Sequence, residues 1–149
     1  MVSAVARIFR PGCKADCMIV MEGKQGIKKS SFVQTLATVD GVSYFTDSVH
    51  DIENKDTALT LQGIWLAEIP ELDAFRRKEA DAIKAWLSRN QDRFRPPYAK
   101  MVQDFPRQSV IAGTMNPSGH GYLRDPTGAR RFWPIPILKD IAREEVIRQ

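Results

Sequence analysis

Residues that hold small or extracellular folds together are scarce in this sequence. Its 149 residues include two cysteines, Cys13 and Cys17, and two histidines, His50 and His120. Two cysteines cannot build a disulfide framework, and these four residues lack the paired ligand spacing of a structural zinc site. The scarcity excludes a disulfide-rich secreted domain, argues against a zinc protein and predicts a reducing, cytoplasmic compartment.

Long hydrophobic runs, internal repeats and low-complexity segments are missing as well. No apolar run approaches the roughly 18–20 residues that span a membrane, and the N-terminus has no signal-peptide pattern. Hydrophobic residues make up 43% of the chain and charged residues 27%, which is typical of a globular protein. We therefore expect a single domain over residues 1–149 that has no membrane partner.

Acidic and basic residues are unevenly distributed along the chain. The net charge of +4 permits a nucleic-acid partner without requiring one. Residues 40–75 hold eight acids and one lysine, a net charge of −7, and residues 76–100 hold eight basic residues and three acids, a net charge of +5. Three interpretations stay open: two solvated faces, head-to-tail association of identical copies, or a basic path for a nucleic-acid backbone.

Apolar runs and turn signals alternate in a strand–helix order. We expect helices over residues 30–38 and 72–87, and strands over residues 18–21, 42–45, 64–67, 109–113 and 132–137. The last strand contains Pro134 and Pro136, which favour a sheet edge because proline cannot donate a ladder hydrogen bond. Two more prolines exclude a regular helix at residues 95–98. The pattern predicts an α/β fold with an open sheet that contains parallel strands.

The strongest motif lies between the first predicted strand and the first predicted helix. A phosphate-binding loop has the pattern G-x-x-x-x-G-K-[S/T] there, because glycine lets backbone N–H groups surround an anion and the helix N-terminus adds partial positive charge. Lys29 would reach the β- and γ-phosphates of ATP, and the Ser30 hydroxyl would bind Mg²⁺. The predicted nucleotide-binding residues are Gly23, Lys24, Gln25, Gly26, Ile27, Lys28, Lys29, Ser30 and Ser31.

Lys28 stands where this pattern has its second glycine. If the backbone there is helical, lysine is a good helix former and its side chain can point to solvent. If the position needs the conformational freedom of glycine, the loop binds ATP poorly. We favour the second interpretation, because position 28 alone breaks the pattern. For the motif as a whole, the structural alternative is an ordinary strand–turn–helix with a lysine-rich first turn.

Three further features point to nucleotide chemistry. Glu68 closes an apolar strand and would hold Mg²⁺ or polarise the attacking water, with Glu71 as the second acid to test. Asn116 ends another buried strand, where an amide can orient that water. Arg130 and Arg131 precede the last strand, and an arginine from a neighbouring subunit can stabilise charge at the γ-phosphate. The structural alternatives are a surface glutamate, a turn-capping asparagine and a salt-bridged turn.

A proline-containing loop carries a second group of candidate residues. Arg93, Arg95 and Tyr98 could grip phosphates and stack a base of DNA. Alternatively, the tyrosine packs against its own domain and the arginines pair with Asp92 or Asp104. The sequence favours neither interpretation over the other.

Taken in order, these motifs resemble the virulence-associated protein E family. Its members are phage- and mobile-element-associated P-loop proteins that are similar to superfamily-three and AAA+ helicases. The resemblance covers nearly the whole chain, and it rests on the strings PGCK (11–14), EGKQG (22–26), KSSF (29–32), LQGIWLAEIPEL (61–72), DRFRPPY (92–98), GTMN (113–116) and LRDPTGARRFW (123–133).

The resemblance implies a P-loop NTPase fold, in which helices flank an open, mainly parallel five-stranded sheet of order 5-1-4-3-2. It implies a role in the replication of mobile DNA, often beside a primase module. By position it makes Lys29 and Ser30 ligands of phosphate and Mg²⁺, Glu68 the acid of the second nucleotide motif, Asn116 the sensor, and Arg130 or Arg131 the arginine finger.

We therefore predict an ATP-binding and ATP-hydrolysing, helicase-like module. Its expected partners are single-stranded or forked DNA, identical copies in a ring such as a hexamer, and a primase. The alternative is a non-hydrolysing DNA- or protein-binding relic of the P-loop fold. A small-molecule kinase fits the Asn116 strand and the paired arginines less well. Because relatives continue beyond the last strand, we expect the domain to be truncated on its C-terminal side.

Overall fold

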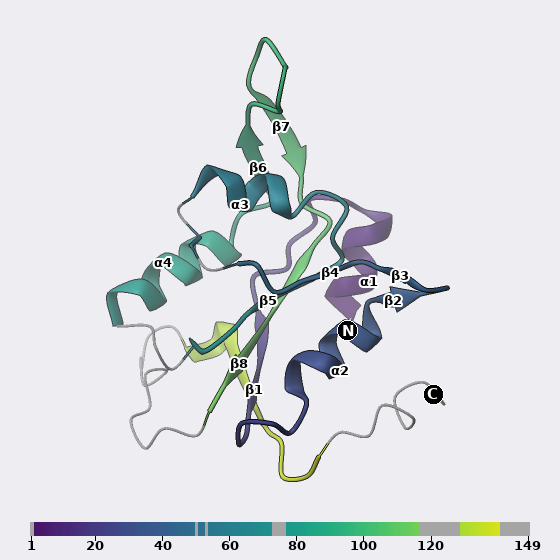
Figure 1. Cartoon of the computed structure of the whole chain (residues 1–149). Helices are drawn as coiled ribbons and strands as arrows, with labels where there is room; N and C mark the ends of the chain where they lie inside the picture. Colours follow the sequence, from purple (N-terminus) through teal and green to yellow (C-terminus); the bar gives the residue numbers. More distant parts are fainter. Residues whose placement is uncertain (1, 50, 53, 73–76, 117–128, 141–149) are drawn as a thin grey trace.

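The computed structural model describes residues 2–49, 51–52, 54–72, 77–116 and 129–140 of the chain. A parallel sheet of five strands forms its centre: β1 (Met18–Glu22), β4 (Phe45–Thr46), β5 (Leu66–Ile69), β8 (Val110–Met115) and β9 (Phe132–Pro136) (Figure 1). Their spatial order is β4-β5-β8-β1-β9. Counted along the chain, this is the predicted order 5-1-4-3-2, and the predicted fold class is confirmed.

Helices cover both faces of this sheet. Alternate residues of β1 point to opposite faces, so that Met18 and Val20 enter one apolar cluster while Met21 enters the other. The first cluster includes residues of α4 (Arg77–Leu87), and the second includes residues of α1 (Val2–Phe9) and α2 (Lys29–Leu36). Since both faces are covered, the central strands are mostly apolar on both faces, as parallel strands usually are, and Glu68 of β5 is a buried exception.

The observed elements differ from the expected ranges in two instructive places. The expected strand 42–45 is divided, because β2 (Thr38–Val39) and β3 (Val42–Ser43) form a hairpin around Asp40 and Gly41. These two turn residues have φ of 49° and 79°, the positive values that tight hairpin turns require. The expected strand 64–67 runs instead from Leu66 to Ile69, so Glu68 lies inside the strand and does not close it.

Three elements were not predicted from the sequence: α1, α3 (Lys55–Thr60) and an antiparallel hairpin. The hairpin consists of β6 (Gln91–Phe94) and β7 (Gln103–Pro106) and projects from the body of the molecule, at the top of Figure 1. The rings of Phe94 and Phe105 stack with their centroids 4.4 Å apart. The predicted loop at residues 95–98 is confirmed and forms part of the hairpin tip.

The predicted position of the last strand at a sheet edge is confirmed. The Ile137 N–H donates to the Glu22 carbonyl of β1 at 2.7 Å, so by the two-residue repeat the nitrogens of Pro134 and Pro136 face away from β1. Proline therefore removes N–H donors from the open side of β9, which hinders pairing with another chain. Within the described part of the chain, no helix is both long and apolar enough to span a membrane.

Candidate functional site

The loop between β1 and α2 contains two glycines of the phosphate-loop pattern or its surroundings and one strained residue, Lys28. A Cβ on Gly23 would lie 2.3 Å from Ile27 Cδ1 and 3.0 Å from the Ile137 carbonyl oxygen, so a side chain there would force its neighbours to shift. Gly26 has φ of 88°, in the region that favours glycine. Lys28 has φ of 61° and ψ of 34° and directly precedes α2. This left-handed conformation costs an L-residue about 1–2 kcal/mol, and it contradicts the interpretation in which the backbone at position 28 is helical.

The Lys29 side chain folds back against the loop and is 9% exposed. Its Nζ donates to the carbonyl oxygens of Gly23 at 2.6 Å and Lys24 at 2.9 Å. It also donates to Asn116 Oδ1 at 3.4 Å. The ammonium therefore connects the start of the loop, at Gly23 and Lys24, to Asn116 after the end of β8.

Glu68 is placed beneath this loop by the alternation of residues along parallel strands. Leu66 of β5 belongs to the apolar cluster on the α2 side, and Glu68, two residues further, points to the same side. Ser30 Oγ donates to Glu68 Oε1 at 2.7 Å, and Thr114 Oγ1 of β8 donates to the same oxygen at 2.5 Å. Glu68 is 0% exposed, and its Oε2 is buried without a hydrogen-bond partner in the part of the chain that the structure describes.

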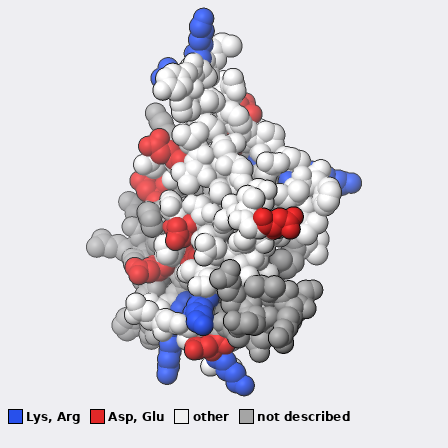
Figure 2. All heavy atoms as spheres, turned by 45° about the vertical axis from the view of Figure 1, so that its right-hand side comes forward, with Lys and Arg blue, Asp and Glu red and all other residues white. Residues whose placement is uncertain are grey.

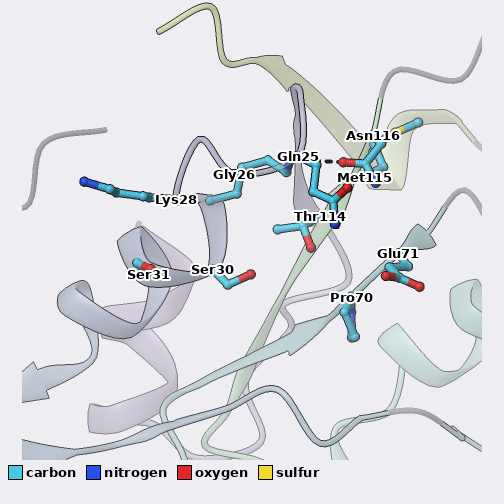
Figure 3. Close-up of a pocket in the computed structure, with 11 residues that line it drawn as sticks. Gln25, Gly26, Lys28, Ser30, Ser31, Pro70, Glu71, Thr114, Met115 and Asn116 are labelled. Carbon is cyan, nitrogen blue, oxygen red and sulfur yellow. Dashed lines mark hydrogen bonds between the residues drawn. The ribbon is translucent and has the colours of Figure 1, made fainter. Parts of the chain in front are cut away.

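A cavity of about 380 Å³ opens above these groups (Figure 3). Glu71 lies at this cavity, is exposed and has φ of 50°, a strained value for a residue other than glycine. Ser30 and Thr114 line the cavity, and their hydroxyl groups separate it from Glu68, to which both donate. The lining residues come from the loop, α2, and the ends of β5 and β8: Gln25, Gly26, Lys28, Lys29, Ser30, Ser31, Pro70, Glu71, Thr114, Met115 and Asn116.

The residues around this cavity suit a phosphate group with a divalent cation. The ammonium of Lys29 and the start of α2 supply positive charge for an anion. The Ser30 hydroxyl and the carboxylate of Glu68 are oxygen ligands of the kind that Mg²⁺ prefers, and the unpartnered Glu68 Oε2 has a free acceptor site. In the described ranges, no group of three or more His, Cys, Asp or Glu residues could hold a metal ion by itself. His50 and His120 lie outside those ranges.

The two candidate arginines lie away from the cavity of their own chain. They belong to a 3-10 helix, η2 (Ala129–Arg131), which precedes β9. Phe132, the next residue, pairs with Met18 at the start of β1, whereas the phosphate-binding loop follows the end of β1. Arg130 is exposed. Arg131 donates to the Lys84 carbonyl at 2.8 Å and lies 3.9 Å from a carboxylate oxygen of Asp16.

The structure thus brings most of the predicted site residues together and adds Thr114, which the sequence analysis overlooked as a site residue. Gly23 and Lys24 supply the carbonyls that bind Lys29, and Ile27 packs beside Gly23. Thr114 could have been predicted from the sequence. It lies two residues before Asn116, a predicted site residue, and residues two apart on a strand share a face. Residues 117–128, which include Asp125 and Gly128 of the arginine-containing loop, lie outside the described ranges.

The sheet order and the loop between β1 and α2 define this chain as a P-loop NTPase fold of the AAA+-like type. The sequence profile of the virulence-associated protein E-like domain matches residues 1–149, and the chain belongs to this family. The family resemblance predicted from the sequence is confirmed. No curated protein sequence matches the chain.

Two solved structures share the fold at low sequence identity. The apo C-terminal region of NrS-1 superposes with a TM-score of 0.59 and 14% identity, over 99% of this chain and 37% of that one. A complex of the magnesium chelatase subunits BchI and BchD matches with a TM-score of 0.53 and 15% identity, over 99% of this chain and 61% of that one. The chain therefore spans about a third and about three fifths of these two neighbours.

Proposed function

We propose that this chain binds ATP with Mg²⁺ at the loop between β1 and α2, hydrolyses it, and acts as a helicase-like module in the replication of phage or mobile-element DNA. The observation that carries the proposal is that Lys29 and Ser30 line one cavity at the carboxyl end of the sheet, where the Ser30 hydroxyl donates to the buried Glu68. These residues come from two segments that lie 38 residues apart in the sequence. Ligands of open α/β sheets bind at this end.

The contacts of Lys29 support phosphate binding. Its ammonium now donates to two neutral carbonyl oxygens and one amide oxygen. A phosphate oxygen carries full negative charge and forms a stronger, charge-assisted hydrogen bond with the same ammonium. Lys29 can therefore move its donors from the loop carbonyls to the ligand.

The two acids would act at different distances from the ligand. Glu68 would hold Mg²⁺ together with Ser30, and bound Mg²⁺ would neutralise charge that develops on the phosphates. We also assign to Glu68 the polarisation of the attacking water, because its Oε2 is an unused acceptor. Glu71 lies at the cavity itself and is the alternative for that second role.

The tip of the β6–β7 hairpin supports a DNA contact. Tyr98 is 106% exposed and has φ of 65°, so it does not pack against its own domain. Arg95 is exposed, whereas Arg93 lies 3.6 Å from Asp104, which agrees with the structural alternative for Arg93. Asp92 pairs with Arg107 instead of either arginine. An exposed aromatic ring and a free cation at a projecting tip can stack a base and bind phosphate.

The positions of the arginines support assembly into a ring. Arg130 is exposed at the opposite end of β1 from its own cavity, so it can reach a nucleotide only in a neighbouring copy. We therefore assign the finger role to Arg130 and a structural role to Arg131, which is hydrogen-bonded within its own chain. Figure 2 shows several acidic side chains along the left side of this face and others near the centre and at the lower end, with basic side chains at the hairpin tip, the right edge and the lower end. Acidic and basic groups on different parts of the surface can meet between copies.

A second function, nucleotide-independent binding of DNA or protein, is favoured by one observation. Lys28 adopts a left-handed conformation at the position where the loop pattern has glycine. A side chain and backbone strain there would weaken nucleotide binding. A protein that had lost ATP hydrolysis could keep the fold and the hairpin tip.

Phosphate release with ATP, Mg²⁺ and single-stranded DNA separates the two functions. The proposed module releases phosphate, does so faster with DNA, and loses the activity in Lys29→Ala. A variant with both Arg95 and Tyr98 replaced by alanine should keep basal release and lose the stimulation. DNA binding without any phosphate release by the parent protein would support the relic, and neither binding nor release would refute both.

A further inference from the structure

Thr114 holds a position in the cavity that the roles proposed above do not explain. It lies on β8, next to β5 in the sheet, where Glu68 is in register with Ala112. Thr114 is two residues beyond Ala112 and therefore points to the same face as Glu68. Its side chain is 5% exposed and donates to Glu68 Oε1 at 2.5 Å.

The two hydroxyl groups that donate to Glu68 differ in their freedom to change partner. Ser30 is exposed in the first turn of α2 and lines the cavity, so its oxygen can turn to a cation. Thr114 is buried on a central strand between β5 and β1. A β-branched side chain on a strand has few accessible rotamers. Thr114 is therefore the donor that can stay on Glu68 when Ser30 has another ligand.

The carboxylate itself shows why such a fixed donor matters. Both hydroxyl groups donate to Oε1, while Oε2 is buried with no partner. Among the described residues no lysine or arginine forms an ion pair with Glu68. A buried carboxylate with so few partners can rotate unless a donor fixes one oxygen. A fixed Oε1 also fixes the direction of Oε2, the carboxylate oxygen that has no hydrogen-bond partner among the described residues.

We propose that Thr114 is a positioning residue for Glu68, whose hydroxyl fixes the carboxylate so that Ser30 and Oε2 are both available to Mg²⁺ bound with the nucleotide. This inference rests on the proposed nucleotide function. It makes β8, which Asn116 follows, part of the cation site as well as of the phosphate site. Thr114 touches neither the reacting atoms nor the nucleotide in this role and acts through Glu68.

The test is the Mg²⁺ dependence of nucleotide binding, measured without turnover. A fluorescent, non-hydrolysable ATP analogue is titrated into the full chain in EDTA and at increasing Mg²⁺. The variants are Thr114→Val, which keeps the shape and removes the donor, and Thr114→Ser, which keeps the donor. For Thr114→Val we expect the Mg²⁺ concentration at half-maximal enhancement of binding to rise about tenfold, as loss of a hydrogen bond to a charged group predicts.

The expected controls follow from the same geometry. Binding in EDTA is the reference for each protein, because it reports Lys29 and the loop without the cation. The Mg²⁺ dependence of Thr114→Ser should stay within about twofold of that of the parent. If the valine variant does not fold, as shown by circular dichroism, Thr114→Cys replaces it, since a thiol is a weak donor of similar size.

The possible failures are distinguishable. An Mg²⁺ dependence in Thr114→Val or its cysteine replacement that equals that of the parent would overturn the positioning role and leave the proposed function intact. Equal weakening in EDTA and in Mg²⁺ would also overturn it, because the effect would then be structural. A parent protein that binds the analogue under neither condition would overturn the proposed function and this inference together.

Discussion

The two ends of the central sheet differ in how they satisfy buried charge. At the amino end, Arg7 and Arg107 are 1% and 2% exposed, and both use their donors within the chain. Arg7 donates to the carbonyl oxygens of Cys13, Ser109 and Arg89. Burial, and then the nearby charge of Arg107, lowers the pKa of Arg7. Arg107 pairs with Asp92, donates to the Trp86 carbonyl and lies 4.7 Å from the centre of the Trp86 ring.

At the carboxyl end, buried charge is only partly satisfied. Glu68 has one oxygen with two donors and one with none. Lys29 donates to carbonyl oxygens that a stronger anionic acceptor could replace. Lys28 and Glu71 add backbone strain at the same cavity. The buried charges of the amino end are thus satisfied within the chain and hold the hairpin base in place, although the Ser109 hydroxyl there has no hydrogen-bond partner among the described residues. The carboxyl end, in contrast, keeps a charged group available for a ligand.

The largest expected effect is at the amino end. Asp92→Ala leaves the buried Arg107 guanidinium without its carboxylate, which should lower the free energy of unfolding by about 3–5 kcal/mol. The matched control is Asp104→Ala, which removes an exposed partner of Arg93 and should cost about 0–1 kcal/mol. Urea unfolding measures both. Similar losses in the two variants would show that the buried pair is no more important than the surface pair.

At the carboxyl end, replacing the acid should affect turnover more than folding or binding. Glu68→Gln keeps an oxygen that accepts from Ser30 and Thr114 but loses the negative charge. We expect ATP binding to be largely retained and turnover to fall by about 10² or more. Steady-state phosphate release measures this, with Glu71→Gln as the matched variant. Unchanged turnover in Glu68→Gln and a comparable fall in Glu71→Gln would transfer the role to Glu71.

If Arg130 acts on the nucleotide of a neighbouring copy, the amino end of one sheet should lie next to the carboxyl end of the neighbour's sheet. Arg130→Ala and Lys29→Ala should each be inactive alone, and mixing them should restore part of the activity. A mixed interface can pair an intact loop with an intact arginine. Sedimentation should confirm that both variants assemble. Absence of rescue at every mixing ratio in assembled protein would rule out action of Arg130 across the interface.

A smaller effect is expected from relieving the strain in the loop. Lys28→Gly should tighten ATP binding by about tenfold, the equivalent of 1.4 kcal/mol, because glycine adopts the observed left-handed backbone without cost. The matched control is Lys24→Gly, which removes an exposed loop lysine of the same charge and should not tighten binding. Equal micromolar affinities of the parent and Lys28→Gly would show that lysine does not impair the loop.

The sequence predicted the carboxyl end of the sheet better than the amino end. The phosphate-loop pattern identified Lys29 and Ser30, apolar strands followed by polar residues identified Glu68 and Asn116, and the family resemblance supplied the strand order. Glu68 was assigned to the strand end because the turn after α3 was read as strand. The fold around the amino end depends on Arg7 and Arg107, whose partners lie up to 102 residues away. No local periodicity reports such contacts, and α1, α3 and the hairpin were missed with them.

The central claim is that the carboxyl end of the sheet, where buried charge is only partly satisfied, is a nucleotide site. Calorimetric titration of ATP with Mg²⁺ into the parent protein and Lys29→Ala tests it most directly. The account predicts saturable one-to-one binding by the parent and its loss in the variant, with unchanged circular dichroism. The variant removes the ammonium that the loop carbonyls hold and nothing at the amino end. Equal binding by the two proteins, or no binding by the parent even after Lys28→Gly, would contradict the claim.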